Sequence, residues 1–246
     1  MLKRNKLLYK ILLICILNLS FLNAKSQYLL SFNDDLGYNN IHKIYSSTSI
    51  AVSYNIEDFT SEIGASILYF DKKENILDGF FIGAGYNFRV NSKNLNIKLK
   101  YLNKIVSNEI REDDMMFIVN RRFTHFEVSG GFNNRFYRFK HKLNKQLSEE
   151  NKGFIIYEPF NFMYLFKYHV NEENAKWDFS PAITNIDDFT VFQETNPMFY
   201  LEGTYKFSEK IDFYSQFWLK KGGMVHASAN FFGCCLRFGI VWKLEK

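Results

Sequence analysis

The last ten residues of the chain, RFGIVWKLEK (residues 237–246), alternate large apolar side chains with small or charged ones. Chain ends are usually polar and loosely ordered unless something holds them in place. A period of two is typical of a β-strand whose two faces meet different surroundings. We therefore interpret this tail as a strand with one uniformly apolar side. The apolar positions of that side are Phe238, Ile240, Trp242 and Leu244.

Five further segments alternate in the same way, and most of them are long. A membrane-spanning strand needs about 9 to 11 residues, whereas strands of soluble proteins usually have about 5 or 6. One face of these segments is rich in Phe and Tyr and the other carries charges and glycines, as in a membrane barrel. They predict an all-β, antiparallel, up-and-down transmembrane β-barrel of about 10 strands, with 8 or 12 also possible. The segments are residues 80–90, 95–101, 160–170, 199–207 and 211–220.

The first 24 residues have the composition of an export signal, with a basic start, an apolar centre and the small residue Ala24 at the end. We expect residues 1–24 to be a signal peptide cleaved near Ala24 and residues 25–246 to form the barrel. The whole chain has a formal net charge of +5, and the leader holds four basic residues and no acid, so about +1 remains. That balance leaves no basic patch for nucleic acid, and we expect no nucleic-acid partner.

Two segments do not fit a single alternating pattern. In residues 113–132 the apolar phase changes near Phe123, which indicates a bulge or a turn. Residues 177–192 contain Pro181, a residue that cannot donate a backbone hydrogen bond to a sheet. The most polar stretch, residues 142–153, is typical of an exposed loop and is the candidate for surface binding.

The closing strand also resembles a known family pattern. Outer-membrane barrel proteins carry a targeting signal in their last strand. Its order is a polar residue, any residue, Gly, any two residues, a large apolar residue, any residue and a second large apolar residue. Arg237, Gly239, Trp242 and Leu244 match it in order, although Glu245 and Lys246 follow where many members end. The resemblance implies a bacterial outer-membrane β-barrel, in contact with outer-membrane lipids and inserted by the barrel assembly machinery. We expect this strand to begin as far upstream as Met224 and to cross the membrane from Phe232 to Leu244.

Few residues suggest chemistry. Motifs for phosphate loops, dinucleotide binding and zinc proteases do not occur in the sequence, and adjacent Cys234 and Cys235 are too few ligands for zinc. We expect no metal and no cofactor. His226 and Ser228 lie two apart on the predicted last strand and resemble the H-x-S pair of lipid A deacylases, although Ala229 stands where those enzymes usually have Asn. The other interpretation is a polar extension of the strand above the membrane.

The predicted inward faces carry charges, which are consistent with two interiors. They would either line an aqueous pore or pair into a salt-bridged plug, and we favour the plug because a barrel of about 8 to 10 strands is nearly filled by side chains. The charged positions are Arg89, Lys98, Lys100, Lys167, Glu202, Lys206, Asp212, Arg237 and Lys243.

We therefore expect a small integral outer-membrane barrel with a structural or surface-binding role, no catalytic activity and a largely filled interior. Three alternatives stay open: a narrow outer-membrane pore, a lipid A deacylase-like hydrolase, and a soluble periplasmic β-barrel or sandwich carrier. The sequence identifies no extracellular ligand.

Overall fold

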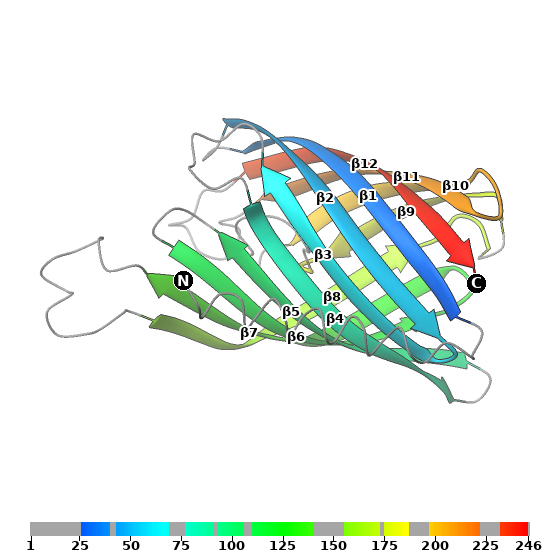
Figure 1. Cartoon of the computed structure of the whole chain (residues 1–246), viewed down its shortest axis with the longest axis horizontal. Helices are drawn as coiled ribbons and strands as arrows, with labels where there is room; N and C mark the ends of the chain where they lie inside the picture. Colours follow the sequence, from blue (N-terminus) through cyan, green and yellow to red (C-terminus); the bar gives the residue numbers. More distant parts are fainter. Residues whose placement is uncertain are drawn as a thin grey trace, which may run out of the picture.

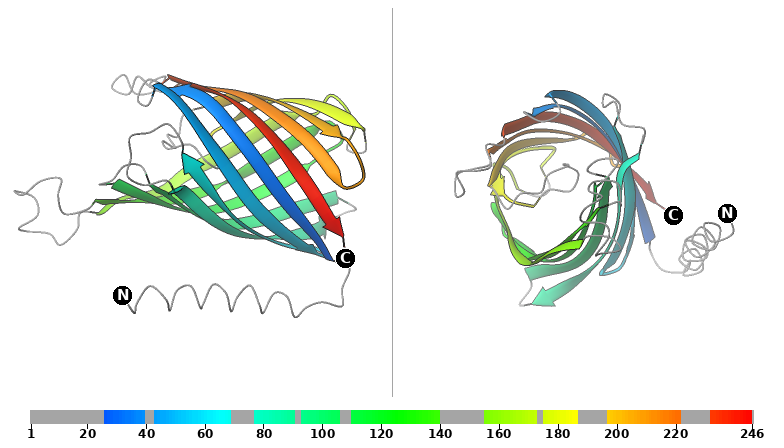
Figure 2. Two further views of the ribbon diagram at one scale, coloured as in Figure 1. Left: turned by 45° about the horizontal axis from the view of Figure 1, so that its top comes forward. Right: turned by 90° about the vertical axis from the view of Figure 1, so that its left-hand side faces the viewer.

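The computed structural model describes residues 26–39, 43–68, 77–90, 93–105, 110–139, 155–172, 175–186, 197–221 and 232–245. They form a closed barrel in which each strand pairs antiparallel with its sequence neighbours (Figures 1 and 2). None of the described residues forms a helix long and apolar enough to cross a membrane. The strands are β1 (Ser26–Asn39), β2 (Lys43–Ile56), β3 (Phe59–Leu68), β4 (Leu77–Val90), β5 (Lys93–Ile105), β6 (Ile110–Arg122), β7 (Phe126–Phe139), β8 (Ile155–Tyr168), β9 (Trp177–Thr184), β10 (Met198–Lys206), β11 (Ile211–Lys221) and β12 (Phe232–Glu245).

The barrel has 12 strands, so the expected number of about 10 is wrong and the larger alternative is right. The barrel closes where the last strand pairs with the first, in a register that runs from Gln27 opposite Glu245 to Asn39 opposite Gly233. The alternating tail is therefore held on both sides, by β1 and by β11. The upstream part of the expected last strand, from Met224, lies outside the described residues.

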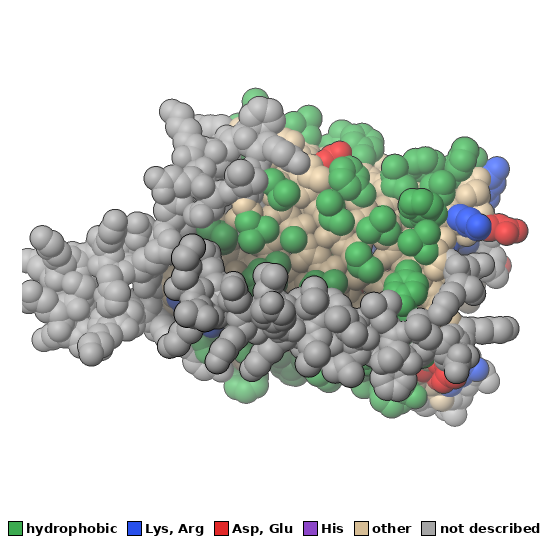
Figure 3. Space-filling view, in the orientation of Figure 1, with side chains coloured by type: hydrophobic (Ala, Val, Ile, Leu, Met, Phe, Trp, Pro, Cys, Tyr) green, Lys and Arg blue, Asp and Glu red, His purple; other side chains and the backbone are tan. Residues whose placement is uncertain are grey.

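The outer wall is apolar, as the alternation predicts. On β12 the outward side chains of Phe238, Ile240 and Trp242 are exposed, whereas inward Cys235 and Gly239 are buried. Large apolar side chains are exposed on the outward face of the other strands as well. Figure 3 shows hydrophobic side chains across the wall, with charges gathered at the end that carries the C-terminus. A wall of this kind suits hydrocarbon and not water. Cys234 and Cys235 point to opposite faces, and both are free thiols.

The two ambiguous segments now have structures. The phase change near Phe123 is a turn between β6 and β7, in which the Phe123 N–H donates to the Phe126 carbonyl at 2.6 Å. Pro181 lies within β9, and the ladder between β8 and β9 covers three pairs that stop at Ala182, next to it. Because proline has no N–H, the ladder is interrupted there. The two segments are hydrogen-bonded again where the Val170 N–H, just after β8, donates to the Phe179 carbonyl of β9 at 3.1 Å.

The even strand number places the start of β1 and the end of β12 at one end of the barrel, which we call the terminal end (Figure 2). The turns at Glu57 and Asp58, at residues 123–125 and at residues 207–210 lie at this end. Strands β1, β3, β5, β7, β9 and β11 end at the opposite end of the barrel, which we call the loop end. Residues 142–153, the candidate surface loop, fall in the connection from β7 to β8, outside the described residues.

Two groups of buried apolar side chains lie inside the barrel. The larger contains Phe81, Leu102, Met116, Ile118 and Met163, with Ala51 and Ile186 packed against it, and so it reaches from β2 to the residues that follow β9. The smaller contains Met198, Trp218 and Cys235, with Tyr45 and Tyr200 beside them. Such groups are typical of a packed core more than of a water-filled channel.

Candidate functional site

A chain of charged and polar groups crosses the inner wall from β8 to β1. Arg237 makes a bidentate ion pair with Asp35, with Nε to Oδ1 at 2.7 Å and Nη2 to Oδ2 at 2.8 Å. Arg237 also reaches Gln216, whose amide donates to Glu202. Glu202 in turn accepts from Lys167 at 2.5 Å. The strand register explains the chain, because Glu202, Gln216, Arg237 and Asp35 are successive cross-strand neighbours.

A second group is built on β6 and β7, where two inward carboxylates share one arginine. Arg135 Nε lies 3.0 Å from Asp114 Oδ1 and 3.5 Å from Glu112 Oε1. Asn133 donates to the same Asp114 oxygen at 2.6 Å. Lys104 adds a further attractive charge for both acids. Because buried charges are costly unless they are paired, this group is held together by mutual compensation.

Three further ion pairs lie on the inner wall, in two groups. Glu62 lies between two lysines, with Lys98 Nζ at 2.7 Å and Lys100 Nζ at 3.7 Å. Lys100 Nζ also lies 4.0 Å from the centre of the Phe81 ring. This cation–π contact links the ion pairs of Glu62 to the larger apolar group. Near the terminal end, Lys243 Nζ lies 2.7 Å from Asp212 Oδ2.

A buried histidine lies between two carboxylates at the terminal end. His169 Nδ1 lies 2.6 Å from Asp178 Oδ2, and its Nε2 lies 3.3 Å from Glu127 Oε2. Ser180 Oγ lies 3.0 Å from the same Nδ1 and donates to Asp178 at 2.6 Å. In a nucleophilic triad the serine and the acid contact opposite nitrogens of the ring, and the histidine accepts the serine proton. Here they share one nitrogen, so the cluster is a hydrogen-bond network and not a triad.

The predicted inward charges lie in three kinds of place. Lys98, Lys100, Lys167, Glu202, Asp212, Arg237 and Lys243 belong to the ion pairs above. Lys206 is half-buried opposite Asp212 in the register, and Arg89 is exposed near the end of β4. Of the four acids that pair with these cations, the sequence predicts Glu202 and Asp212 but not Asp35 and Glu62, which lie on strands whose alternation is weak. The missed charged residues are Asp35, Glu62, Lys104, Glu112, Asp114, Glu127, Arg135, Asp178 and Lys220.

The residues of the assembly pattern have distinct positions in the barrel. Arg237 holds Asp35 of the first strand, and Gly239 lies beneath the ring of Tyr214. Trp242 and Leu244 are exposed on the outer wall near the terminal end. The candidate pair His226 and Ser228 lies outside the described residues. Within the described ranges, no group of three or more His, Cys, Asp or Glu residues is placed to hold a metal ion.

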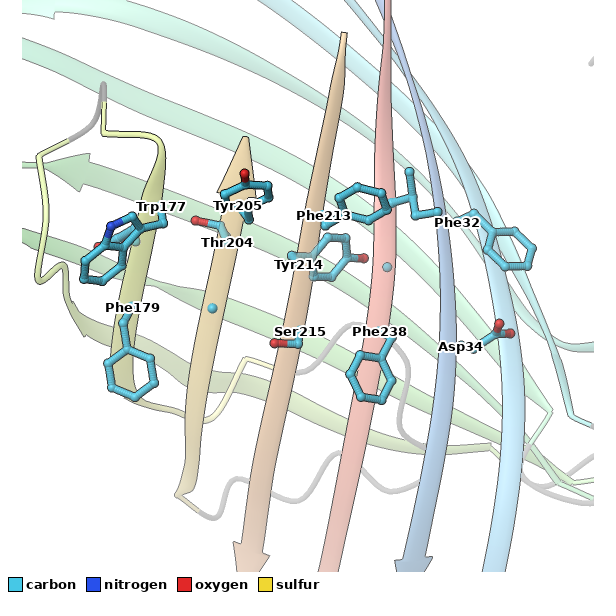
Figure 4. Close-up of a pocket in the computed structure, with 14 residues that line it drawn as sticks. Phe32, Asp34, Trp177, Phe179, Thr204, Tyr205, Phe213, Tyr214, Ser215 and Phe238 are labelled. Atoms are coloured by element: carbon cyan, nitrogen blue, oxygen red, sulfur yellow. The ribbon is translucent and has the colours of Figure 1, made fainter. Parts of the chain in front are cut away.

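A shallow recess lies on the outer wall over β9 to β12 and β1, with a volume of about 740 Å³. Figure 4 shows the aromatic side chains of Phe179, Tyr205, Phe213 and Phe238 around it. Its small residue Gly203 pairs with Ser215, so the recess lies where two neighbouring strands carry little side-chain volume. These aromatic residues belong to the apolar outer face and not to the interior. Acyl chains are the natural occupants of such a surface in a membrane.

No protein-family model matches the chain, and no curated protein matches it. Solved structures do match. The NanC porin has a TM-score of 0.54 and 12% identity, over 87% of this chain and 100% of that one. The KdgM porin in complex with disordered oligogalacturonate has a TM-score of 0.53 and 8% identity, over 86% and 98%. The translocator domain of the autotransporter NalP from Neisseria meningitidis has a TM-score of 0.52 and 12% identity, over 97% and 95%. The chain has the fold of bacterial outer-membrane β-barrel proteins.

Proposed function

We propose that this protein is an integral outer-membrane barrel that does not conduct and does not catalyse, with an interior filled by its own side chains. Its role is then structural, or lies in binding at the loop end. One observation carries the proposal: inward Glu112 and Asp114 have no exposed surface, and the larger apolar group packs beside them across several strands. An aqueous channel would leave its lining charges in contact with water.

The inward lysines support the same interior. Lys220, Lys104 and Lys100 are exposed by only 2, 3 and 5%. A lysine is almost never this buried unless its charge is compensated, and compensation by neighbouring acids needs close packing. The barrel is wider than the one expected from the sequence, so more side chains are needed to fill it. The two apolar groups and the ion pairs supply them.

The outer-membrane location rests on the outer wall and on the fold. A water-soluble carrier would not expose Phe160 by 71% and Phe199 by 60% on one continuous apolar wall. The neighbouring solved structures are porins and a translocator domain, which supports the same location. Cleavage near Ala24 stays a prediction.

Planar-bilayer recording tests the filled interior. Purified wild-type protein is expected to give no steady conductance. The variant Met116→Ala with Met163→Ala removes two inward side chains of the larger apolar group and is expected to admit ions. The matched control, Met115→Ala with Phe162→Ala, changes the outward neighbours of the same two residues and is expected to stay silent. Steady conductance from the wild-type protein would show that the proposal is wrong.

A narrow pore is the second candidate, and the two porins with TM-scores above 0.5 favour it. If the wild-type barrel conducts, the inward cations of β5 and β8 are the candidates for ion selectivity. Oligogalacturonate, the molecule bound to KdgM, is then the first solute to test as a blocker. A change in selectivity on Lys98→Gln, with no change on Arg121→Gln on the outer face, would assign the current to this interior.

A further inference from the structure

Two arginines lie side by side on the outer face near the loop end. Arg111 of β6 and Arg138 of β7 are direct cross-strand neighbours, and both are exposed. Their outward direction follows from the alternation, because Met115 and Phe117 on β6 and Phe132 on β7 share this face and are exposed. Like charges directly opposite each other on a sheet are destabilising. The pair therefore needs an anion beside it.

Asp113 provides part of that compensation and also orients one arginine. Its Oδ2 lies 2.6 Å from Arg138 Nε, while its Oδ1 accepts from Asn103 at 2.8 Å and from the Tyr101 hydroxyl. The Asp113 side chain is 3% exposed, whereas that of Arg138 is 62% exposed. The carboxylate thus contacts the guanidinium at Nε, while most of the Arg138 side chain remains exposed.

The charges of this outward cluster do not balance. Within the described parts of β5, β6 and β7, Asp113 is the one carboxylate on the outer face, beside two arginines. Its oxygens already accept from Tyr101 and Asn103 in addition to the contact with Arg138. Among these described residues, one positive charge of the pair is therefore not balanced.

The depth of the pair in the membrane follows from β6 itself. Arg111 and Arg121 lie on the same outward face, ten residues apart, with Met115, Phe117 and Val119 between them. A strand rises about 3.3 Å per residue and tilts by about 40° in such barrels, which places the two arginines about 25 Å apart along the membrane normal. That is the height of the apolar belt of an outer-membrane barrel. Arg121 thus marks the terminal-end boundary, and Arg111 and Arg138 mark the boundary at the loop end.

We propose that Arg111 and Arg138 bind the phosphate group of a membrane lipid in the leaflet at the loop end. Two guanidinium groups on neighbouring strands present the planar, multidentate donors that match a phosphate. The acyl chains of the same lipid then lie on the apolar wall formed by Leu99, Met115 and Phe117. A free phosphate ion would have no use for this wall, so the site is assigned to a lipid headgroup. The inference requires insertion in a membrane but does not depend on whether the interior conducts.

The test measures lipid retention by the full-length folded barrel. The protein is placed in nanodiscs that contain equal amounts of phosphatidic acid and diacylglycerol, released into detergent, and examined by native mass spectrometry. Wild type is expected to retain phosphatidic acid over diacylglycerol by about tenfold, the scale of one charge-assisted contact. Arg111→Gln with Arg138→Gln is expected to lose that preference, while Arg121→Gln keeps it.

Three results would overturn the inference: equal retention by the wild type and the double variant, equal loss in Arg121→Gln, or displacement of the lipid by inorganic phosphate at matched concentration. The last would identify a simple anion site. Heat-modifiable gel migration of every variant shows that the barrel has folded, so loss of lipid is not loss of structure. Conductance of the same samples is recorded separately, which keeps a failure of this site distinct from a failure of the filled interior.

Discussion

The ring of Tyr214 on β11 lies across Gly239 on β12, and its hydroxyl donates to Asn33 on β1. A Cβ atom at position 239 would lie 2.4 Å from Tyr214 ring atoms and 2.5 Å from Asn33 Oδ1. Glycine is therefore the residue that lets one side chain link β11 to β1 across the closing strand. Its place in the terminal pattern has a structural reason in addition to any role in recognition.

Replacing this glycine is expected to loosen the barrel closure. Gly239→Ala pushes the Tyr214 ring off the strand, and overpacking of this kind costs about 1–3 kcal/mol. Urea unfolding of the detergent-refolded barrel, followed by tryptophan fluorescence, measures the change. Gly130→Ala is the matched control, because a Cβ at position 130 meets no atom within 4 Å. Equal stabilities of the two variants would show that the Tyr214 contact contributes nothing.

The ion pair between Arg237 and Asp35 joins the last strand to the first, and its loss is expected to be costly. Arg237→Gln leaves a carboxylate that is 4% exposed without its guanidinium, and breaking a buried pair costs about 3 kcal/mol. Unfolding in urea measures the loss for refolded protein. Asp35→Asn together with Arg237→Gln is expected to recover part of it, because no uncompensated charge remains.

The same variants separate folding from recognition. If Arg237 also acts in the assembly signal, the double variant recovers stability in vitro but still accumulates poorly in the outer membrane. If the residue acts only through Asp35, the two measurements recover together. Western blots of membrane fractions beside the urea curves make the comparison.

Incubation with lipid A is expected to release no fatty acid. In the described part of the barrel, the Ser180 hydroxyl donates to the Asp178 carboxylate and not to His169, so this cluster lacks the serine–histidine pair of a nucleophilic site. The remaining candidates are His226 and Ser228, which the described residues do not include. Release that disappears in Ser228→Ala but persists in Ser180→Ala would contradict the non-catalytic proposal and identify the nucleophile.

The strands that the sequence predicts well are those whose two faces differ most. Residues 80–90, 160–170 and 211–220 alternate aromatic and polar side chains, and the structure has β4, β8 and β11 there. β2 was missed because Ser46, Ser47, Thr48 and Ser49 place small polar groups on both faces, so the contrast on which the pattern depends is absent. This loss of contrast explains why the strand number was set too low.

The sequence pattern does not reveal β6 for the opposite reason, because both faces of this strand carry apolar side chains. Its inward Met116 and Ile118 are as apolar as its outward Met115 and Phe117, because the larger apolar group lies inside the barrel at this level. The ion pairs were out of reach of sequence reasoning for a related cause. The partner of Arg237 is 202 positions away on β1, and which strands become neighbours is decided only when the ring closes. Sequence alone therefore identifies which charges face inward, including Glu202 and Asp212, but not which of them become partners across the closed ring.

Two adjacent aspartates on β1 offer the sharpest test of which side of the barrel faces lipid. Asp34 is exposed on the outer wall, between outward Phe32 and Leu36, and accepts from Thr48 at 2.5 Å. Asp35 faces inward and holds Arg237. Asp34→Asn is expected to raise the free energy of unfolding in lipid vesicles by about 1 kcal/mol, because a carboxylate leaves the hydrocarbon. Asp35→Asn is expected to lower it by about 3 kcal/mol, because Arg237 then lies in the interior without its carboxylate. Urea titrations in vesicles give both values, and a lower stability for Asp34→Asn would show that this carboxylate has a bound partner and not bare lipid.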